Sequence, residues 1–190
     1  MTHISYKYRL YPTKSQEVLL NKTFGCVRWV YNWGLARKMA VYQETGKGMN
    51  VFALCNEMTK LKAMEETIWL KEVGAQALQS SLQHLDKAYT GFFREKKGFP
   101  KFKSKYGKQS FASPQCSDLD FDASLLYIPK FREGIKAVFH RKFKGKIKTV
   151  TVSKSKTGKY YANVLVENEG DHPVPVSPTE AKTLGIDLGL

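Results

Sequence analysis

Apolar and polar residues alternate at the start of the chain and then recur at helical spacing. Apolar side chains at positions 4, 6, 8 and 10 predict a strand over residues 4–10 that stops at Pro12. Thr13 and Gln16 in T-K-S-Q form a capping box that begins a helix. This helix is predicted to reach about residue 44, with Gly25 as a candidate break and residues 46–48 as its stop. Its apolar stripe is Val18, Leu19, Val27, Val30, Tyr31, Leu35 and Met39.

Two more helices are predicted before residue 98. Asn50 can cap one that runs to about residue 62, and a short segment around Trp69 leads to another over residues 74–97. Apolar residues at spacings of four and three give this last helix one buried face. They are Leu78, Leu82, Leu85, Tyr89 and Phe92.

The pattern changes abruptly after residue 97. The sequence G-F-P-K-F-K-S-K-Y-G-K-Q, with two glycines and a proline among lysines, predicts a loop. Short strands are expected at residues 125–129, 135–143, 149–153 and 160–167, the last two joined by a turn at Gly158. Helices cannot supply partners for strand 4–10, so it should pair with these later strands. We therefore predict an α+β fold in which inserted helices interrupt a small antiparallel β-barrel.

These elements divide the chain into five expected parts. Residues 1–12 form the first barrel strand, residues 13–97 the helical insertion, and residues 98–170 the barrel with its basic entry loop. Residues 171–180 carry three prolines and are typical of a linker. Residues 181–190 include T-L-G-I-D-L-G-L, an apolar strand interrupted by the carboxylate of Asp187.

Composition narrows the class of protein. The 190 residues are 42% hydrophobic and 13% aromatic, which excludes general disorder. Thirty-one lysines and arginines against seventeen acidic residues leave a net charge of +14, which favours a nucleic-acid partner. The sequence shows no membrane-spanning run and no secretory signal, so we expect a cytoplasmic, nucleoid-associated protein without a membrane partner. The scattered Cys26, Cys55 and Cys116 indicate reduced thiols and no zinc site.

Nearly all of the excess charge lies in one third of the chain. Residues 94–160 hold eighteen lysines and arginines and five acidic residues, a net charge of +13. A basic face is often only a solvated surface that binds no partner. Here aromatic residues recur among the cations, as in surfaces that bind nucleic-acid backbones and bases, so the pattern favours phosphate binding.

Asp187 stands in an otherwise apolar strand, where its desolvation calls for a cation. Three interpretations are open: a turn residue at the strand end, a metal-binding carboxylate of an RNase-H-like nuclease, or part of the nucleotide site of an actin-like ATPase. A basic, aromatic-rich barrel with inserted helices favours the nuclease, because an ATPase has no use for one.

Five sequence blocks, in their order and spacing over the whole chain, resemble the N-terminal half of a TnpB-family protein. This family comprises RNA-guided DNA endonucleases that are encoded by insertion sequences and related to type V CRISPR effectors. The resemblance implies an OB-like wedge barrel split by a helical recognition domain and followed by the first strand of a RuvC nuclease domain. The blocks are R-L-Y-P-T-K-S-Q (9–16), V-R-W-V-Y-N-W-G-L-A (27–36), A-L-Q-S-S-L-Q-H-L-D-K-A-Y (77–89), G-F-P-K-F-K (98–103) and G-I-D-L-G-L (185–190).

The sequence departs from the family pattern at its end. The family's nuclease domain continues with a catalytic Glu, a zinc-binding insertion and a final Asp, whereas this chain stops three residues after Asp187. A lone carboxylate cannot hold the Mg²⁺ expected for the full-length family, so this chain alone should not cleave DNA. A fragment, the ordered part of a longer protein, and a natural derivative that binds without cutting all fit the sequence.

The resemblance implies two nucleic-acid partners, a guide RNA from the transposon end and a double-stranded target DNA, with the missing nuclease portion or a second copy of the chain as further candidates. In this mode of recognition, base pairing between guide and target reads the sequence, and the protein contacts the nucleic-acid backbone and recognises its shape. Arg28 and Asn32 are either hydrogen-bonding residues at the core edge or RNA contacts. The candidate backbone contacts are Arg9, Arg28, Asn32, Lys96, Lys97, Lys101, Lys103, Lys105, Lys108, Lys130, Arg132, Lys136, Arg141, Lys142, Lys144 and Lys146.

A short motif beside the DNA target must also be read, and the predicted helix 74–97 offers side chains for this. Carboxamides suit adenine edges in the major groove, although solvent-facing Gln and Ser are often inert. The candidates are Gln76, Gln79, Ser80 and Gln83, with Asn50 and Phe52 nearby. Two guide-independent alternatives are a transposon-encoded helix-turn-helix regulator of DNA and an OB-like RNA-binding protein; an ATPase fragment is a remote third.

Overall fold

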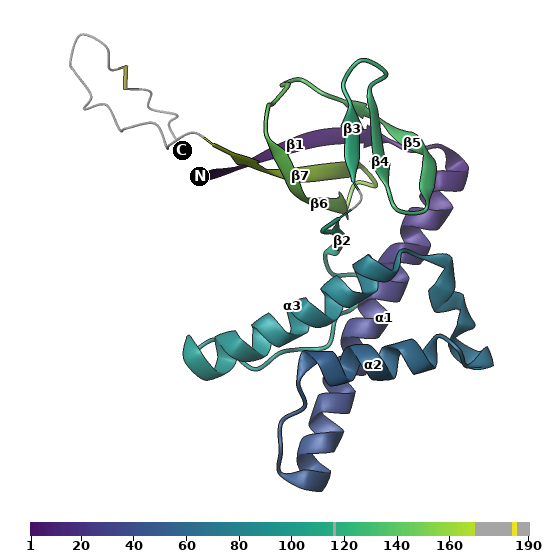
Figure 1. The fold of residues 1–190 in the computed structure, drawn as a ribbon, viewed down its shortest axis with the longest axis vertical. Coiled ribbons are helices and arrows are strands. Elements are labelled where there is room, and N and C mark those ends of the chain that lie inside the picture. The colour runs from purple at the N-terminus through teal and green to yellow at the C-terminus, as the bar shows by residue number, and fades with distance from the viewer. Residues whose placement is uncertain (116, 170–183, 186–190) are drawn as a thin grey trace.

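The computed structural model describes residues 1–115, 117–169 and 184–185. A curled antiparallel sheet of seven strands stands beside a layer of helices, so the fold is α+β (Figure 1). The strand order is β2-β6-β7-β1-β5-β4-β3, which leaves β2 and β3 as edges and makes the sheet a half-barrel. The elements are β1 (Thr2–Tyr11), α1 (Lys14–Thr45), α2 (Val51–Leu61), the 3₁₀ helix η1 (Glu65–Glu72), α3 (Ala75–Arg94), β2 (Gln109–Ser113), β3 (Asp118–Asp120), β4 (Leu125–Ile128), β5 (Phe131–Val138), β6 (Lys146–Lys154) and β7 (Tyr160–Asn168).

The first strand lies in the middle of the sheet. It pairs with β7 from Thr2 to Leu10 and with β5 from Arg9 to Tyr11, so the expectation that it joins the later strands is confirmed. Its inward side chains, Tyr8 and Leu10, are fully buried. Burial raises the pKa of Tyr8 to about 12, which keeps its hydroxyl protonated to donate a 2.6 Å hydrogen bond to the Arg141 carbonyl.

Helix α1 is continuous over 32 residues. Both arms of the predicted capping box at Thr13 are formed, and Gly46 ends the helix in the left-handed conformation at φ 67°. Gly25 does not break it, which corrects that prediction; nothing lies within 4 Å of the position its Cβ would take. The predicted apolar stripe is wrong at both ends, since Val18 and Met39 are exposed and Leu20, Phe24 and Cys26 are buried. The buried face is set by contacts with α3 and β2, which periodicity does not locate.

Helices α2 and α3 begin where the sequence predicts. The Asn50 side chain accepts a hydrogen bond from the Ala53 amide and caps α2. Helix α3 packs its leucine stripe against α1, close enough that a Cβ on Gly34 would lie 2.8 Å from Leu82 Cδ2. It ends at Arg94 instead of residue 97, because Lys96 turns the chain with a φ of 54°.

The later strands differ in part from the prediction. Strands β4, β6 and β7 match, and Gly158 turns the β6–β7 hairpin at φ 78°. The short strands β2 and β3 are absent from the prediction because their alternation is too brief to detect. Strand β5 runs from Phe131 to Val138 and not over the predicted residues 135–143. Residues 139–143 lie outside the sheet, where Phe139 and Phe143 pack in an aromatic cluster with Tyr6, Tyr8 and Phe121.

The proposed linker, 171–180, lies outside the described residues, and so does Asp187. Within the part of the chain that is described, no helix is long and apolar enough to cross a membrane.

Candidate nucleic-acid interface

The basic loop at residues 98–108 is fastened to helix α1. The Asn32 side-chain oxygen accepts a 2.7 Å hydrogen bond from the Lys103 amide, and its nitrogen donates a 3.0 Å bond to the Lys103 carbonyl. The Lys103 ammonium lies 3.9 Å above the Tyr31 ring, and burial lowers the pKa of this lysine. Asn32 therefore holds the loop, which supports the first of its two interpretations, a hydrogen-bonding residue at the core edge.

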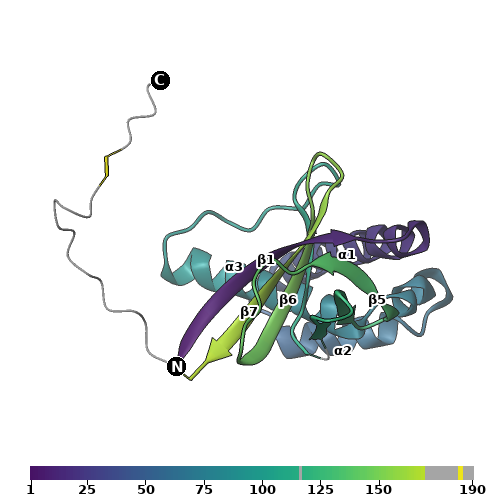
Figure 2. The ribbon, with the colours of Figure 1, turned by 90° about the horizontal axis from the view of Figure 1, so that it is seen from above.

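Beyond this anchor the loop forms one wall of a cleft of about 830 Å³, hereafter the cationic cleft. Helix α1 and the β6–β7 turn form its other walls, and Figure 2 shows that turn beside the loop. No carboxylate is among its lining residues. The lining residues are Asn21, Phe24, Arg28, Lys105, Tyr106, Gly107, Lys108, Gln109, Lys154, Ser155 and Lys156.

Gln109 fixes the shape of this cleft. Its amide nitrogen donates to the carbonyls of Lys105 and Gly107 at 2.7 and 3.0 Å, and its oxygen accepts from Arg28 at 2.9 Å. The loop cations are thus presented by a fixed backbone. Tyr106, 81% exposed, adds an aromatic face beside them.

Two cleft cations, Lys154 and Lys156, are missing from the sequence-based set of contacts. They lie in and beside the β6–β7 turn, and the pairing of Gln109 with Lys154 brings them to the loop. Their only sequence signal is their position at the turn of a predicted hairpin. The contact across more than forty residues depends on β2, which the sequence does not reveal.

Other predicted cations lie at the opposite end of the β6–β7 hairpin. Lys142, Lys144 and Lys146 line a separate hollow of about 780 Å³ together with Glu167 and Glu169. The Lys142 ammonium lies 3.2 Å from Asp122, and that of Lys148 lies 3.3 Å from Glu167. Strands of nine residues separate this hollow from the cationic cleft by roughly 26 Å. The basic third of the sequence therefore does not form one continuous channel.

The remaining predicted backbone contacts are dispersed. Arg9 donates to the Tyr160 carbonyl at 3.2 Å and lies over the Tyr11 and Tyr161 rings. Lys97 pairs with Glu95 at 2.6 Å. Lys96, Lys101, Lys130, Arg132, Lys136 and Arg141 are exposed and line none of these hollows.

The candidate motif-reading residues separate into free and engaged side chains. Gln79 and Gln83 are exposed on α3, and Phe52 is 77% exposed on α2. Gln76 donates to the Gln115 side chain at 3.1 Å. Ser80 is only 6% exposed, because it faces the packed side of the helix. The expectation that its hydroxyl is free to contact DNA is therefore wrong. Asn50 is engaged in capping α2.

Cysteine chemistry and metal ligation have no evident place in this interface. Burial raises the pKa of the Cys26 thiol to about 11, which keeps it protonated and unreactive. Among the described residues, no group of three His, Cys, Asp or Glu side chains could hold a metal ion. Cys116 and Asp187 lie outside those residues.

Residues 1–47 match a family described as a helix-turn-helix domain, HTH_OrfB_IS605. In the structure this region is a strand followed by the unbroken helix α1, without a turn between two helices.

Longer relatives match almost the whole chain. "Putative RNA-guided DNA endonuclease InsQ" of Escherichia coli is 33% identical over 186 residues, covering 98% of this chain and 45% of the relative. A Streptomyces pristinaespiralis protein of the same general description is 29% identical over 188 residues, 98% of this chain and 46% of the relative. The chain thus spans less than half the length of either. "Virulence protein VsdF" of Salmonella dublin is 35% identical over 111 residues, which are 54% of this chain and 93% of that protein.

Proposed function

The chain belongs to the TnpB family of insertion-sequence proteins, and from this premise we propose that it binds a guide RNA and target DNA as part of an RNA-guided DNA endonuclease. The observation that carries the proposal is the cationic cleft. Five cations from three separate segments converge there without a carboxylate in the lining. Such a site favours a polyanion, since each phosphate it binds releases condensed counterions.

The cleft would hold backbone and leave sequence reading to base pairing. Its volume of about 830 Å³ suits a short stretch of backbone and not a whole duplex. Lys105, Lys108, Lys154, Lys156 and Arg28 would contact phosphates, and Tyr106 would stack on a base. We propose that the scaffold of the guide RNA occupies this site.

Target DNA would be read by helix α3. Gln79 and Gln83 are exposed, and a carboxamide can bond to both the N6 and N7 positions of adenine in the major groove. Phe52 is a further exposed candidate at the start of α2. We keep Gln76 as a secondary candidate, because it must first release Gln115.

The domain limits stay part of this proposal. Residues 13–97 would be a helical recognition insertion and residues 98–170 the wedge, with 181–190 beginning a RuvC domain. The endonuclease activity would use a divalent metal, Mg²⁺ in our proposal, at a site that includes Asp187.

The RNA that co-purifies with the chain tests the proposal. We expect one discrete species of uniform length, which sequencing would map to the end of the encoding element. A guide-independent binder would retain a heterogeneous population of RNAs, or none, and either result would contradict guided recognition. The family match keeps the helix-turn-helix alternative open, but because α1 is a single helix, its second helix would have to lie outside residues 1–47.

A further inference from the structure

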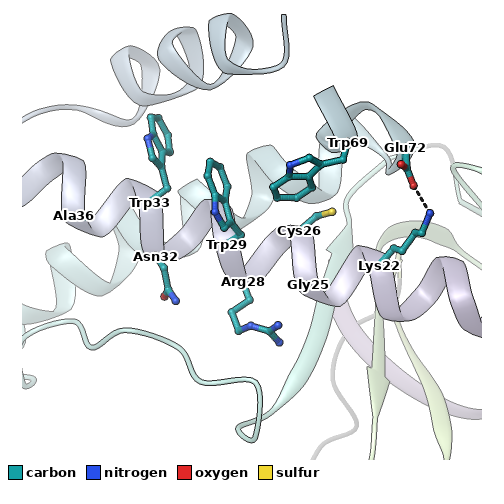
Figure 3. A pocket seen from close by; sticks show the side chains of 10 residues that line it. All are labelled: Lys22, Gly25, Cys26, Arg28, Trp29, Asn32, Trp33, Ala36, Trp69 and Glu72. Carbon is teal, nitrogen blue, oxygen red and sulfur yellow. Dashed lines mark hydrogen bonds and ion pairs between the residues drawn. The ribbon is translucent and has the colours of Figure 1, made fainter. Parts of the chain in front are cut away.

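A second hollow, hereafter the tryptophan groove, runs along the exposed side of α1 and encloses about 710 Å³. All three tryptophans of the chain line it: Trp29 and Trp33 from α1, and Trp69 from η1. Figure 3 shows Trp29 and Trp33 on one side of the helix, with Trp69 next to Trp29 and with Arg28 and Asn32 pointing to the other side. Each of the three indoles is half-buried, so part of each ring is open to solvent.

The two α1 tryptophans present parallel faces. Their rings are tilted by only 6° to one another and their centroids are 6.4 Å apart. Four residues of helix rise by about 6 Å, so two indoles in similar orientations lie one turn apart. The Trp69 and Trp29 rings meet edge to face with their centroids 5.3 Å apart. Trp69 also donates its Nε1 hydrogen to the Glu66 carbonyl. This contact supports the Trp29 ring from the side of η1.

The parallel faces of these rings suit a planar aromatic ligand. Stacked bases lie about 3.4 Å apart, so a base with an indole on each face requires about 6.8 Å between them. The centroid distance of 6.4 Å is the upper limit of the face-to-face separation of these nearly parallel rings, so a base would enter between them only as the indoles move apart. We propose that Trp29 and Trp33 form a stacking site for one unpaired base of a single-stranded nucleic acid, an inference that rests on the proposed nucleic-acid function.

The charges around the groove favour a nucleotide over an apolar side chain. Arg28 lines both hollows, but its guanidinium points to the cleft side of α1, so a strand whose phosphates lie in the cleft would reach the indoles by passing around α1 at this residue. The one carboxylate in the groove, Glu72, is paired with Lys22. A strand entering the groove therefore meets no free acidic group among the lining residues.

Intrinsic fluorescence tests this site directly, because every tryptophan of the chain lies in the groove. The probe is a single-stranded ten-nucleotide oligothymidylate, with a blunt duplex of equal length as comparison. We expect saturable quenching by the single strand and much less by the duplex. The variant Trp33→Leu keeps an apolar side chain against the core but removes the ring, and it should weaken single-strand binding roughly 5- to 150-fold.

The matched control is Phe93→Leu, which removes an exposed aromatic ring from α3, outside the groove, and leaves all three indoles in place. It should retain quenching and bind the single strand within about threefold of the unaltered chain. A helical circular dichroism spectrum like that of the unaltered chain would show that Trp33→Leu is folded. If that variant does not fold, Trp33→Phe serves instead, and it should bind with intermediate affinity.

Three results would each contradict the proposal in a different way. If the unaltered chain binds the single strand without a change in tryptophan emission, and Trp33→Leu binds equally well, the stacking site is wrong while nucleic-acid binding stands. If neither oligothymidylate nor RNA binds at all, the proposed function itself is wrong. Quenching by an unrelated apolar peptide, but not by the oligonucleotide, would assign the groove to a protein ligand and overturn the proposal.

Discussion

The two ends of the β6–β7 hairpin carry similar numbers of lysines but differ in their surroundings. At the turn, Lys154 and Lys156 join the loop cations in the cationic cleft, and none of its five cations forms an ion pair within the described part of the chain. At the other end, Lys142 and Lys148 are paired with Asp122 and Glu167, and Glu169 lines the same hollow as Lys144. We therefore expect the two ends of one hairpin to differ in their capacity to bind phosphate.

This difference shows that a run of positive charge in a sequence is not yet a binding site. A lysine that already lies against a carboxylate gains less from a phosphate, because the pair must separate or the carboxylate must remain close to the new anion. Concavity and the absence of acidic neighbours, both set by the fold, select the effective cations.

The largest effect is expected when the cleft is neutralised. Lys105, Lys154 and Lys156 changed together to Gln should weaken guide-RNA binding on the order of 100-fold near 0.1 M salt. The plot of log affinity against log salt concentration should also become shallower by about 2 to 3, since three phosphate contacts are lost. Fluorescence anisotropy over a salt series measures both quantities.

The same substitutions at Lys142, Lys144 and Lys146 are the matched control, because they remove the same charge from the other end of the hairpin. We expect a change in slope of less than about 1. Equal losses for the two triple variants would show that net charge, and not the cleft, determines affinity. The unfolding temperature should change little for either variant, because five of the six lysines are exposed and the half-buried Lys154 loses one side-chain hydrogen bond, to Asn21.

A second variant separates backbone binding from motif reading. Gln79→Ala should weaken binding to the correct target-adjacent duplex by about 1 to 3 kcal/mol and leave guide-RNA affinity unchanged, since a carboxamide contact discriminates one base pair. The cleft variant should do the reverse. A competition assay with correct and scrambled duplexes measures the difference, and equal losses on both duplexes would assign Gln79 to non-specific contact.

The anchor of the basic loop gives a smaller effect. Asn32→Asp keeps an acceptor for the Lys103 amide but loses the donor to the Lys103 carbonyl and places a negative charge beside it. We expect trypsin to cleave within residues 98–108 faster and RNA affinity to fall by about 1 to 2 kcal/mol. Asn32→Ala is the companion variant, which lacks the added charge. If both variants resist trypsin like the unaltered chain, Asn32 does not hold the loop.

The sequence predicted those features that depend on residues close together in the chain, and it missed those that depend on contacts between distant segments. The Thr13 and Asn50 caps, the Gly46 stop and the leucine stripe of α3 depend on residues within one or two turns, and the structure has all of them. The placement of Lys154 beside Lys105 depends on β2, an edge strand of five residues with little alternation. The role of Asn32 depends on a loop seventy residues away, so no spacing within α1 could indicate it.

The smallest expected effect is a change in the titration of His84, close to the loop anchor. Burial lowers the pKa of His84, and the charges of Lys103 and Lys87 lower it further. A phosphate bound near Lys103 would offset that charge and raise the His84 pKa toward its ordinary value of about 6.5. Binding would then take up protons, so RNA affinity should rise slightly as pH falls from about 7.5 to 5.5.

Nuclear magnetic resonance titration of the imidazole, with and without saturating RNA, measures this shift. In the free protein Lys103→Gln should raise the His84 pKa by itself and reduce the further change on RNA binding, because the opposing charge is already gone. The triple variant at Lys142, Lys144 and Lys146, which lies outside the cationic cleft, should leave the shift in the His84 pKa unchanged. A His84 pKa that stays constant while RNA saturates the protein would show that the bound phosphates remain at the Lys105 end of the loop and do not extend to its anchor.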